Sequence, residues 1–137
     1  MSDSNSAWQL ANDYVQRVDQ RQFSAMSDIL WPEFQQRGPG FASASAAEFI
    51  AGLELLRRYD RTFHQLGSQF GRWRADRYEG ESYCVASHFY GDDSGERRMD
   101  MGIRYLDVIE RRGGLAKYLS RDIVLVWSED RPYQPVF

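Results

Sequence analysis

The sequence predicts an α+β fold in which three N-terminal helices pack on one face of a strongly curved antiparallel sheet. Two patterns support this prediction. Apolar residues recur at helical spacing as far as about residue 59, and from residue 62 to about residue 127 they alternate with a period of two. The 137 residues fit a single domain, with a core over about 7–128 and an extended tail over 129–137.

The first two helices are predicted from the spacing of apolar residues. A helix is expected over 7–20, because five apolar residues there fall at helical spacing: Trp8, Ala11, Tyr14, Val15 and Val18. A second, short helix is expected over 22–30, with apolar residues on one side. It should stop near Pro32, since the residue before a proline is disfavoured in the helical conformation.

The third helix is predicted after a loop at 38–40, where the sequence reads Gly-Pro-Gly. Ser45 and Glu48 match a capping box, which marks the start of a helix. The helix is expected to end near Tyr59. Its buried stripe consists of Phe49, Ile50, Leu53 and Leu56.

Four strands account for the rest of the predicted core. They are expected over about 62–74, 82–90, 98–111 and 115–127. Turns are expected at 76–80, 91–95 and 113–114, where glycine and aspartate gather. These strands are longer than the usual five or six residues or so, which indicates a strongly curved sheet.

Composition and charge exclude several classes of protein. The net charge is −3 with acidic and basic residues interspersed, so no basic field attracts nucleic acid. A single cysteine, Cys84, excludes an intrachain disulfide, indicates a reducing compartment and is expected to be a buried hydrophobe. The sequence has no signal peptide and no apolar run that spans a bilayer. We therefore expect a cytoplasmic protein that binds neither nucleic acid nor membrane.

The two histidines of the chain, His64 and His88, both lie in strand-like segments. One hairpin turn between them predicts that their imidazoles lie roughly opposite each other on one face. Because histidine has an ordinary pKa of about 6.5, two on one face are a candidate acid/base pair. The alternative is that each is a half-buried strand residue satisfied by a neighbour.

Three further side chains are candidates for the same site. Asp19, in the last turn of the first helix, faces the negative end of the helix dipole, so another interaction or solvation must stabilise it. Tyr14 lies on the buried stripe of the first helix. The alternative to a role in the site is that it is an ordinary core residue. Arg121 begins an alternation with Ile123, Leu125 and Trp127. On the inner face its guanidinium needs an anionic partner, whereas on the outer face it is solvated.

The spacing of potential ligands favours neither a metal nor a cofactor. The histidines are far apart in sequence and have no nearby cysteine or acidic ligand motif, which is weak evidence for zinc. No phosphate-binding glycine loop and no serine elbow is present in the sequence.

Five motifs follow one another between about residues 8 and 127: Tyr14-x-x-x-x-Asp19, Thr62-x-His64-x-x-Gly67, Ala86-x-His88, Arg104-Tyr105-x-Asp107 before Gly113-Gly114, and Arg121. In this order they resemble the SnoaL-like branch of the nuclear-transport-factor-two-like superfamily. The resemblance implies a cone-shaped domain with a deep apolar pocket between helices and sheet. The site pattern is most similar to cofactor-independent enzymes such as scytalone dehydratase, bile acid 7α-dehydratase and hexachlorocyclohexane dehydrochlorinase.

The resemblance also implies roles for the candidate residues. Asp19 orients His64, which abstracts a proton, while Tyr14 and His88 donate to an oxyanion or a departing hydroxyl. Arg121 anchors the substrate or acts as a fixed charge. The chain departs from scytalone dehydratase where two tyrosines are replaced, by Val18 and Gly38, and in its short tail. Scytalone itself is therefore a poor substrate candidate.

Two functions follow from these observations. The first is a cofactor-independent lyase (dehydratase) or isomerase acting on a small hydrophobic, cyclic, oxygenated molecule. The second is a non-catalytic ligand-binding or structural domain, like the small subunit of a ring-hydroxylating oxygenase, in which Asp19 and His64 do not meet or bulky side chains fill the pocket. A homodimer or homotrimer is expected through the aromatic convex face of the sheet.

Overall fold

The structure, a computed structural model, describes residues 3–136. Its helices are α1 (Asp3–Asp19), α2 (Ala46–Leu53) and the 3-10 helices η1 (Phe23–Asp28) and η2 (Glu54–Arg58). The strands in the described part of the chain are β1 (Leu30–Gly38), β2 (Phe41–Ser43), β3 (Arg61–Arg74), β4 (Arg77–Asp92), β5 (Gly95–Arg112) and β6 (Leu115–Pro132). Within 3–136, no helix is long and apolar enough to cross a membrane.

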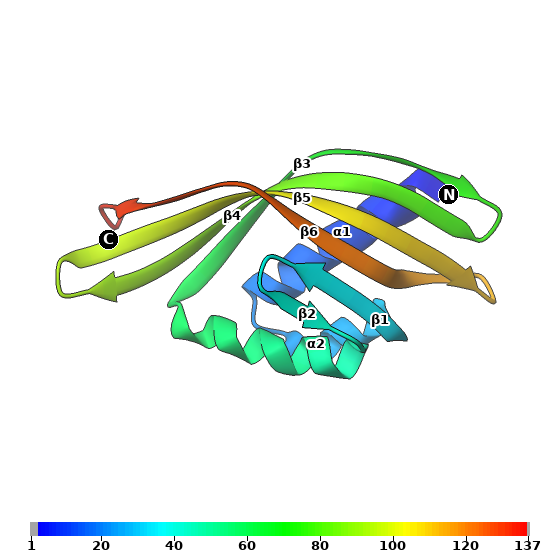
Figure 1. The fold of residues 1–137 in the computed structure, drawn as a ribbon, viewed down its shortest axis with the longest axis horizontal. Helices are drawn as coiled ribbons and strands as arrows, with labels where there is room; N and C mark the ends of the chain where they lie inside the picture. The colour runs from blue at the N-terminus through cyan, green and yellow to red at the C-terminus, as the bar shows by residue number, and fades with distance from the viewer. Residues whose placement is uncertain (1–2, 137) are drawn as a thin grey trace.

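The strands form one curved, open sheet in the order β2-β1-β6-β5-β4-β3. Strands β3 to β6 are an antiparallel meander, as predicted, and β1 joins it by parallel pairing with β6. Figure 1 shows α1 and α2 on the same side of the long strands. The α+β class and the curved, helix-covered sheet are thus confirmed.

Strands β1 and β2 were not expected from the sequence. The main reason is Pro32, which was interpreted only as the end of the second helix. In the structure the ladder between β1 and β6 is interrupted between Leu30 and Gln35. Pro32 lies in this gap, so its missing N–H breaks no regular pairing with β6.

The predicted second and third helices differ from the structure in their details. The second is a single 3-10 helix, η1, and the third divides into α2 and η2. The backbone N–H of Glu48 donates to Ser45 Oγ at 3.1 Å, as a capping box requires. The Glu48 carboxylate accepts from the N–H of Ala44 at 3.4 Å rather than from Ser45.

The turn predicted at 76–80 was placed too late. Arg74 pairs with Arg77, so the turn consists of Ala75 and Asp76, and Ala75 has a φ of 53°. Gly80 lies inside β4, opposite Gly71. A Cβ at either glycine would come within 2.4 Å of the Tyr78 hydroxyl, so these glycines make room for that ring.

A bulge in β6 changes the face on which its last residues lie. Gly102 pairs with Trp127 and Ile103 with Leu125, which leaves Val126 unpaired with β5. The predicted alternation therefore fails at Trp127, which lies on the opposite face from Leu125. Strand β6 also continues to Pro132, into the segment interpreted as a tail.

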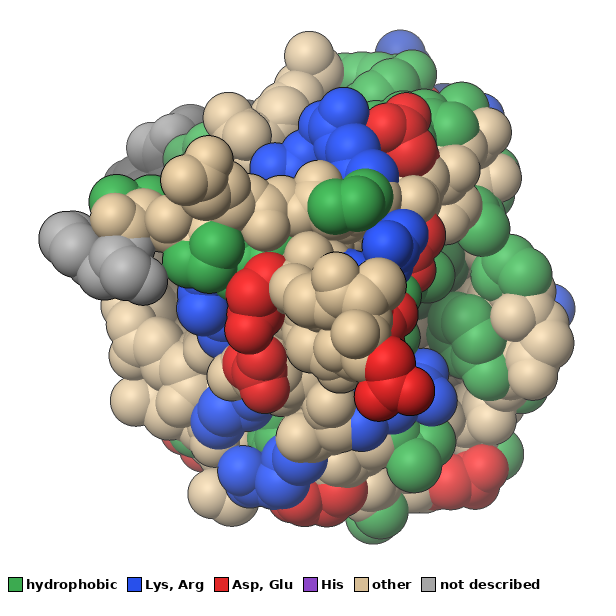
Figure 2. All heavy atoms as spheres, turned by 90° about the vertical axis from the view of Figure 1, so that its left-hand side faces the viewer, with side chains coloured by type: hydrophobic (Ala, Val, Ile, Leu, Met, Phe, Trp, Pro, Cys, Tyr) green, Lys and Arg blue, Asp and Glu red, His purple; other side chains and the backbone are tan. Residues whose placement is uncertain are grey.

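The end of the sheet around the β4–β5 turn is highly charged. Figure 2 shows acidic and basic side chains interspersed on this face of the molecule. Arg97 Nε of β5 pairs with Asp130 Oδ1 of β6 at 3.0 Å. These charges surround the strand ends, whereas the apolar core lies between the helices and the concave face.

Candidate active site

A cavity of about 560 Å³ lies between the helices and the concave face of the sheet. Its wall is mostly apolar and includes Val18, Phe49, Leu53, Ala86, Met99, Met101, Ile103 and Ile123. Five residues with polar groups and largely buried side chains also line it: Tyr14, Gln36, His64, His88 and Tyr105. An apolar cavity with a few convergent polar groups is the usual form of a site for a small hydrophobic molecule.

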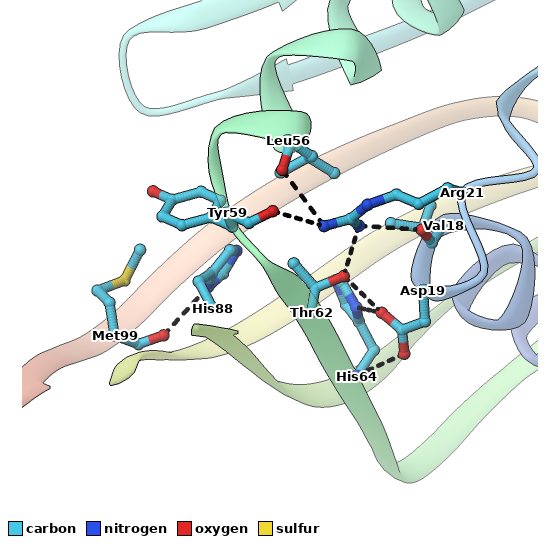
Figure 3. A network of polar contacts seen from close by, with 9 residues as sticks. All are labelled: Val18, Asp19, Arg21, Leu56, Tyr59, Thr62, His64, His88 and Met99. Atoms are coloured by element: carbon cyan, nitrogen blue, oxygen red, sulfur yellow. Dashed lines mark hydrogen bonds and ion pairs between the residues drawn. The ribbon is translucent and has the colours of Figure 1, made fainter. Parts of the chain in front are cut away.

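Asp19 and His64 meet at the edge of this cavity. Asp19 is the last residue of α1, and His64 lies near the start of β3. His64 Nδ1 is 2.6 Å from Asp19 Oδ1, and the backbone N–H of His64 donates to Asp19 Oδ2 at 2.8 Å. The contact expected between these two side chains is therefore present (Figure 3).

The hydrogen bonds identify which atoms carry hydrogens. Burial opposes ionisation of Asp19, but hydrogen bonds from His64 and Thr62 outweigh it and lower the pKa of the carboxyl. An ionised carboxylate only accepts hydrogen bonds, so His64 Nδ1 must carry a hydrogen. Nε2 of the neutral ring then keeps a free lone pair.

His88 is held by a different partner from His64. His64 pairs with Ala86 and His88 with Thr62, so the two imidazoles are diagonal neighbours rather than opposite each other as predicted. They share the concave face, with ring centroids 6.4 Å apart. The offset of two residues follows from the turn at Ala75 and Asp76, together with the bulge in β3.

The neighbours of His88 determine which of its ring nitrogens carries the hydrogen and favour the neutral ring. Nδ1 is 3.1 Å from the carbonyl oxygen of Met99, and the ring lies against Tyr59 with centroids 4.9 Å apart. A carbonyl only accepts, so Nδ1 carries the hydrogen and Nε2 is an acceptor. Burial lowers the pKa of His88, which favours this neutral ring.

Tyr14 lies deep in the cavity wall, 4% exposed. Its ring packs against Phe49, Tyr105 and Tyr118. Burial raises the pKa of its hydroxyl, although the nearby Arg121 guanidinium opposes the shift. The hydroxyl therefore stays protonated at neutral pH.

Arg121 is fully buried and is not among the residues that line the cavity. It has the anionic partner that the inner-face alternative requires. Nε donates to Asp107 Oδ1 at 2.6 Å, and Nη2 donates to Asp107 Oδ2 at 2.9 Å and to the Tyr118 hydroxyl at 3.0 Å. Its guanidinium carbon lies 4.3 Å from the centroid of the Tyr14 ring. This arrangement favours the fixed-charge role over the substrate-anchor role.

Three residues around the site have contacts for which the sequence predicted no role. Gln36 is a buried amide in the cavity wall, and it was missed because β1 was missed. Thr62 donates to Asp19 Oδ1 at 2.9 Å, and its position two residues before His64 could have placed it on the same face. Arg21 donates to Thr62 Oγ1 at 2.9 Å, and no sequence pattern indicated it.

Other candidate chemistries have little support in the described residues. Cys84 is 3% exposed, and burial raises the pKa of its thiol to about 11, as expected of a structural cysteine. In the same part of the chain, no three histidine, cysteine, aspartate or glutamate side chains lie together as potential metal ligands.

Comparison with known proteins identifies a family and several structures of the same fold. Residues 1–121 match the SnoaL-like domain family. No curated protein matches the sequence.

Three solved structures illustrate the likeness. A putative scytalone dehydratase from Novosphingobium aromaticivorans is 14% identical, with 96% of this chain and 89% of that chain covered and a TM-score of 0.83. The hexachlorocyclohexane dehydrochlorinase LinA-type3 from Novosphingobium barchaimii is 18% identical, with 96% and 94% covered and a TM-score of 0.83. ActVI-ORFA from Streptomyces coelicolor is 18% identical, with 91% and 96% covered and a TM-score of 0.74. At these identities the likeness shows the fold.

Proposed function

Because the chain belongs to the SnoaL-like domain family, we propose that it is a cofactor-independent lyase (a dehydratase) or isomerase acting on a small hydrophobic, cyclic, oxygenated molecule. The observation that carries this proposal is the 2.6 Å contact between Asp19 and His64 at a cavity of about 560 Å³. A structural domain of this fold would need neither the contact nor the open cavity, and a ligand-binding domain would need only the cavity. The solved structures named as a putative scytalone dehydratase and a dehydrochlorinase are consistent with elimination chemistry.

In the proposed reaction His64 is the general base. Its Nε2 takes a proton from a carbon next to a carbonyl, and the electrons of the broken C–H bond form an enolate. Asp19 stabilises the resulting imidazolium through Nδ1–H. Proton transfer of this kind contributes about 10²- to 10⁴-fold in rate.

Tyr14 is the proposed oxyanion donor. Its protonated hydroxyl stabilises the negative oxygen of the enolate, which is an interaction made only as charge develops. In a dehydration the enolate electrons then form the C=C bond while the C–O bond breaks. The imidazolium of His64 returns its proton to the departing hydroxide, so water leaves and the base is regenerated. In an isomerisation the same proton returns to another carbon.

His88 has a role different from the expected donor role. Because its Nδ1–H is bonded to Met99 O, the neutral ring presents only a lone pair at Nε2. We propose that this nitrogen accepts the hydrogen of a substrate hydroxyl and orients the leaving group. Arg121 is the fixed positive charge behind Tyr14, balanced by Asp107.

A substrate screen tests this function. Cyclic β-hydroxy ketones and alcohols are incubated with the protein without added cofactor, and loss of water is followed by mass spectrometry. Turnover is expected for at least one member, and Asp19→Asn should lower it by about 10²- to 10⁴-fold. If wild type and Asp19→Asn bind the same compounds equally well and convert none of them, the protein is a binding domain instead.

A further inference from the structure

Arg21 has a backbone conformation that arginine rarely adopts. It follows the end of α1 and has a φ of 59°. The N–H of Gln22 donates to Arg17 O at 2.8 Å, and that of Arg21 donates to Val18 O at 3.1 Å, which is the pattern of a Schellman cap. Glycine is the usual residue at this left-handed position. An arginine there opposes the backbone preference, which points to a role for its side chain.

The Arg21 guanidinium connects three elements around the site (Figure 3). Nη1 donates to the carbonyl of Val18 in α1 at 3.2 Å and to Thr62 Oγ1 in β3 at 2.9 Å. Nη2 donates to the carbonyl of Leu56 in η2 at 3.3 Å and to that of Tyr59 at 3.5 Å. The end of α1 is thereby fixed relative to the strand that carries His64.

A chain of hydrogen bonds runs from Arg21 through Thr62 and Asp19 to His64, and the donor and acceptor of each bond are defined. Arginine has donors and no acceptor, so Thr62 Oγ1 accepts from Arg21 and must use its one hydrogen elsewhere. That hydrogen goes to Asp19 Oδ1, at 2.9 Å. The same oxygen is 2.6 Å from His64 Nδ1. With Thr62 oriented as a donor, Asp19 remains an acceptor and His64 must supply the hydrogen from Nδ1.

We propose that Arg21 and Thr62 are positioning residues that hold the Asp19 carboxylate against the His64 ring and so keep the His64 hydrogen on Nδ1, with Nε2 free toward the cavity. The value of a free Nε2 rests on the proposed function, but the hydrogen-bond chain itself is testable without a substrate. The side chain of Thr62 is buried, and its hydrogen bond contributes to the lowered pKa of Asp19.

The first test compares two substitutions of Thr62. Thr62→Val keeps the volume but removes the hydroxyl, whereas Thr62→Ser keeps the hydroxyl. The pKa of Asp19 is measured by carboxyl ¹³C NMR, with Asp19→Asn identifying the signal. Because Thr62→Val removes a hydrogen bond to a charged carboxylate, the pKa of Asp19 should rise by about one unit in this variant. In Thr62→Ser the pKa of Asp19 should remain near the wild-type value.

The second test uses Arg21→Gly with a matched control, Ala75→Gly. Arg21 and Ala75 are the non-glycine residues of positive φ in the described part of the chain, and Ala75 lies in the β3–β4 turn. Both substitutions relieve a left-handed backbone, but only Arg21→Gly removes the guanidinium. The pKa of Asp19 should rise in Arg21→Gly and stay unchanged in Ala75→Gly.

A second readout follows the imidazole directly. The chain has two histidines, so a ¹⁵N-histidine spectrum contains two rings, and His88→Gln assigns them. Wild type should show His64 protonated at Nδ1 at alkaline pH. In Thr62→Val and Arg21→Gly the Asp19 carboxylate is held less firmly, so a fraction of the His64 rings should lose the contact with Asp19 and show the Nε2–H form.

The outcomes separate this inference from the proposed function. An unchanged Asp19 pKa and an unchanged His64 tautomer in either Thr62→Val or Arg21→Gly overturn the positioning role. If Thr62→Val does not fold, Arg21→Gly decides by the same two measurements. Shifts as expected in a protein that converts no substrate leave the positioning role supported and the lyase proposal contradicted.

Discussion

The imidazoles of His64 and His88 lie with their ring centroids 6.4 Å apart on one face of the β3–β4 pair, yet each donates its Nδ1–H to a different kind of acceptor. His64 faces the carboxylate of Asp19, which stabilises a positive ring. His88 faces a neutral backbone carbonyl, that of Met99, and its burial disfavours a positive ring. The two histidines are therefore suited to different tasks, a base that becomes charged and an acceptor that stays neutral.

Asp19 and His64 should behave as one catalytic unit. On a substrate found by screening, Asp19→Asn and His64→Ala should each lower kcat/KM by about 10²- to 10⁴-fold. The double variant should have a kcat/KM only slightly below that of the less active single variant, because either change removes the same base. Asp28→Asn, an exposed aspartate in η1, is the control. Melting temperatures should show that all variants are folded, and independent multiplying losses would contradict a shared role.

His88 should make stability depend on pH below its ordinary pKa of 6.5. Its pKa is lowered in the folded protein, so between the two values the unfolded chain binds more protons. The stability it contributes is present above pH 6.5 and is lost as the pH falls through the folded pKa. Urea unfolding gives the free energy of unfolding of wild type and His88→Gln at each pH in this range. The two plots of this free energy against pH should converge at lower pH. Asp19 does not titrate in this range, because its ordinary pKa of 3.8 lies below it. Parallel plots for the two proteins would contradict the assignment of this pH dependence to His88.

Breaking the buried Arg121–Asp107 pair should be costly. Arg121→Met leaves the Asp107 carboxylate buried without a cation, and such changes cost about 3–5 kcal/mol of unfolding free energy. Arg37–Asp122 is a matched pair at the surface, joined by two hydrogen bonds and with Arg37 72% exposed. Arg37→Met should change the unfolding free energy far less, because solvent screens this exposed pair. Equal midpoints for the two variants in urea would show that the buried charge is not critical.

The convex face of the sheet should mediate self-association. Phe63 and Val126 are 60% and 59% exposed, and Tyr83 and Trp127 line a groove on this face. Sedimentation at micromolar concentration should show a dimer or trimer. Val126→Lys should shift it toward 16.0 kDa particles, whereas Leu115→Lys, at the exposed β5–β6 turn, should not. Wild-type particles of 16.0 kDa alone would contradict this interface.

Several parts of the fold followed from local patterns in the sequence. Helical spacing identified α1, and the alternation of apolar residues identified the four strands of the meander. The Asp19–His64 contact was expected from the family resemblance and is present. The helix and the strands are predictable because a residue's face depends only on its position within one helix or strand.

The errors arose where a residue's environment depends on a distant segment. Pro32 was interpreted as a terminator because nothing local shows that β6 leaves a gap opposite it. Gly80 was assigned to a turn, although it is glycine because the Tyr78 ring crosses the strand pair there. Trp127 was placed on the wrong face because a single bulge residue, Val126, reverses the alternation.

The sequence by itself determined the α+β class, a first helix with Asp19 in its last turn and the placement of both histidines on one face of the sheet. Only the tertiary structure decided the partners: Thr62 for Asp19, Arg21 for Thr62, the Met99 carbonyl for His88 and Asp107 for Arg121. The physical reason is the range of the interactions. Periodicity acts over a few residues, whereas a hydrogen-bond partner is chosen by register and packing between segments far apart in the chain.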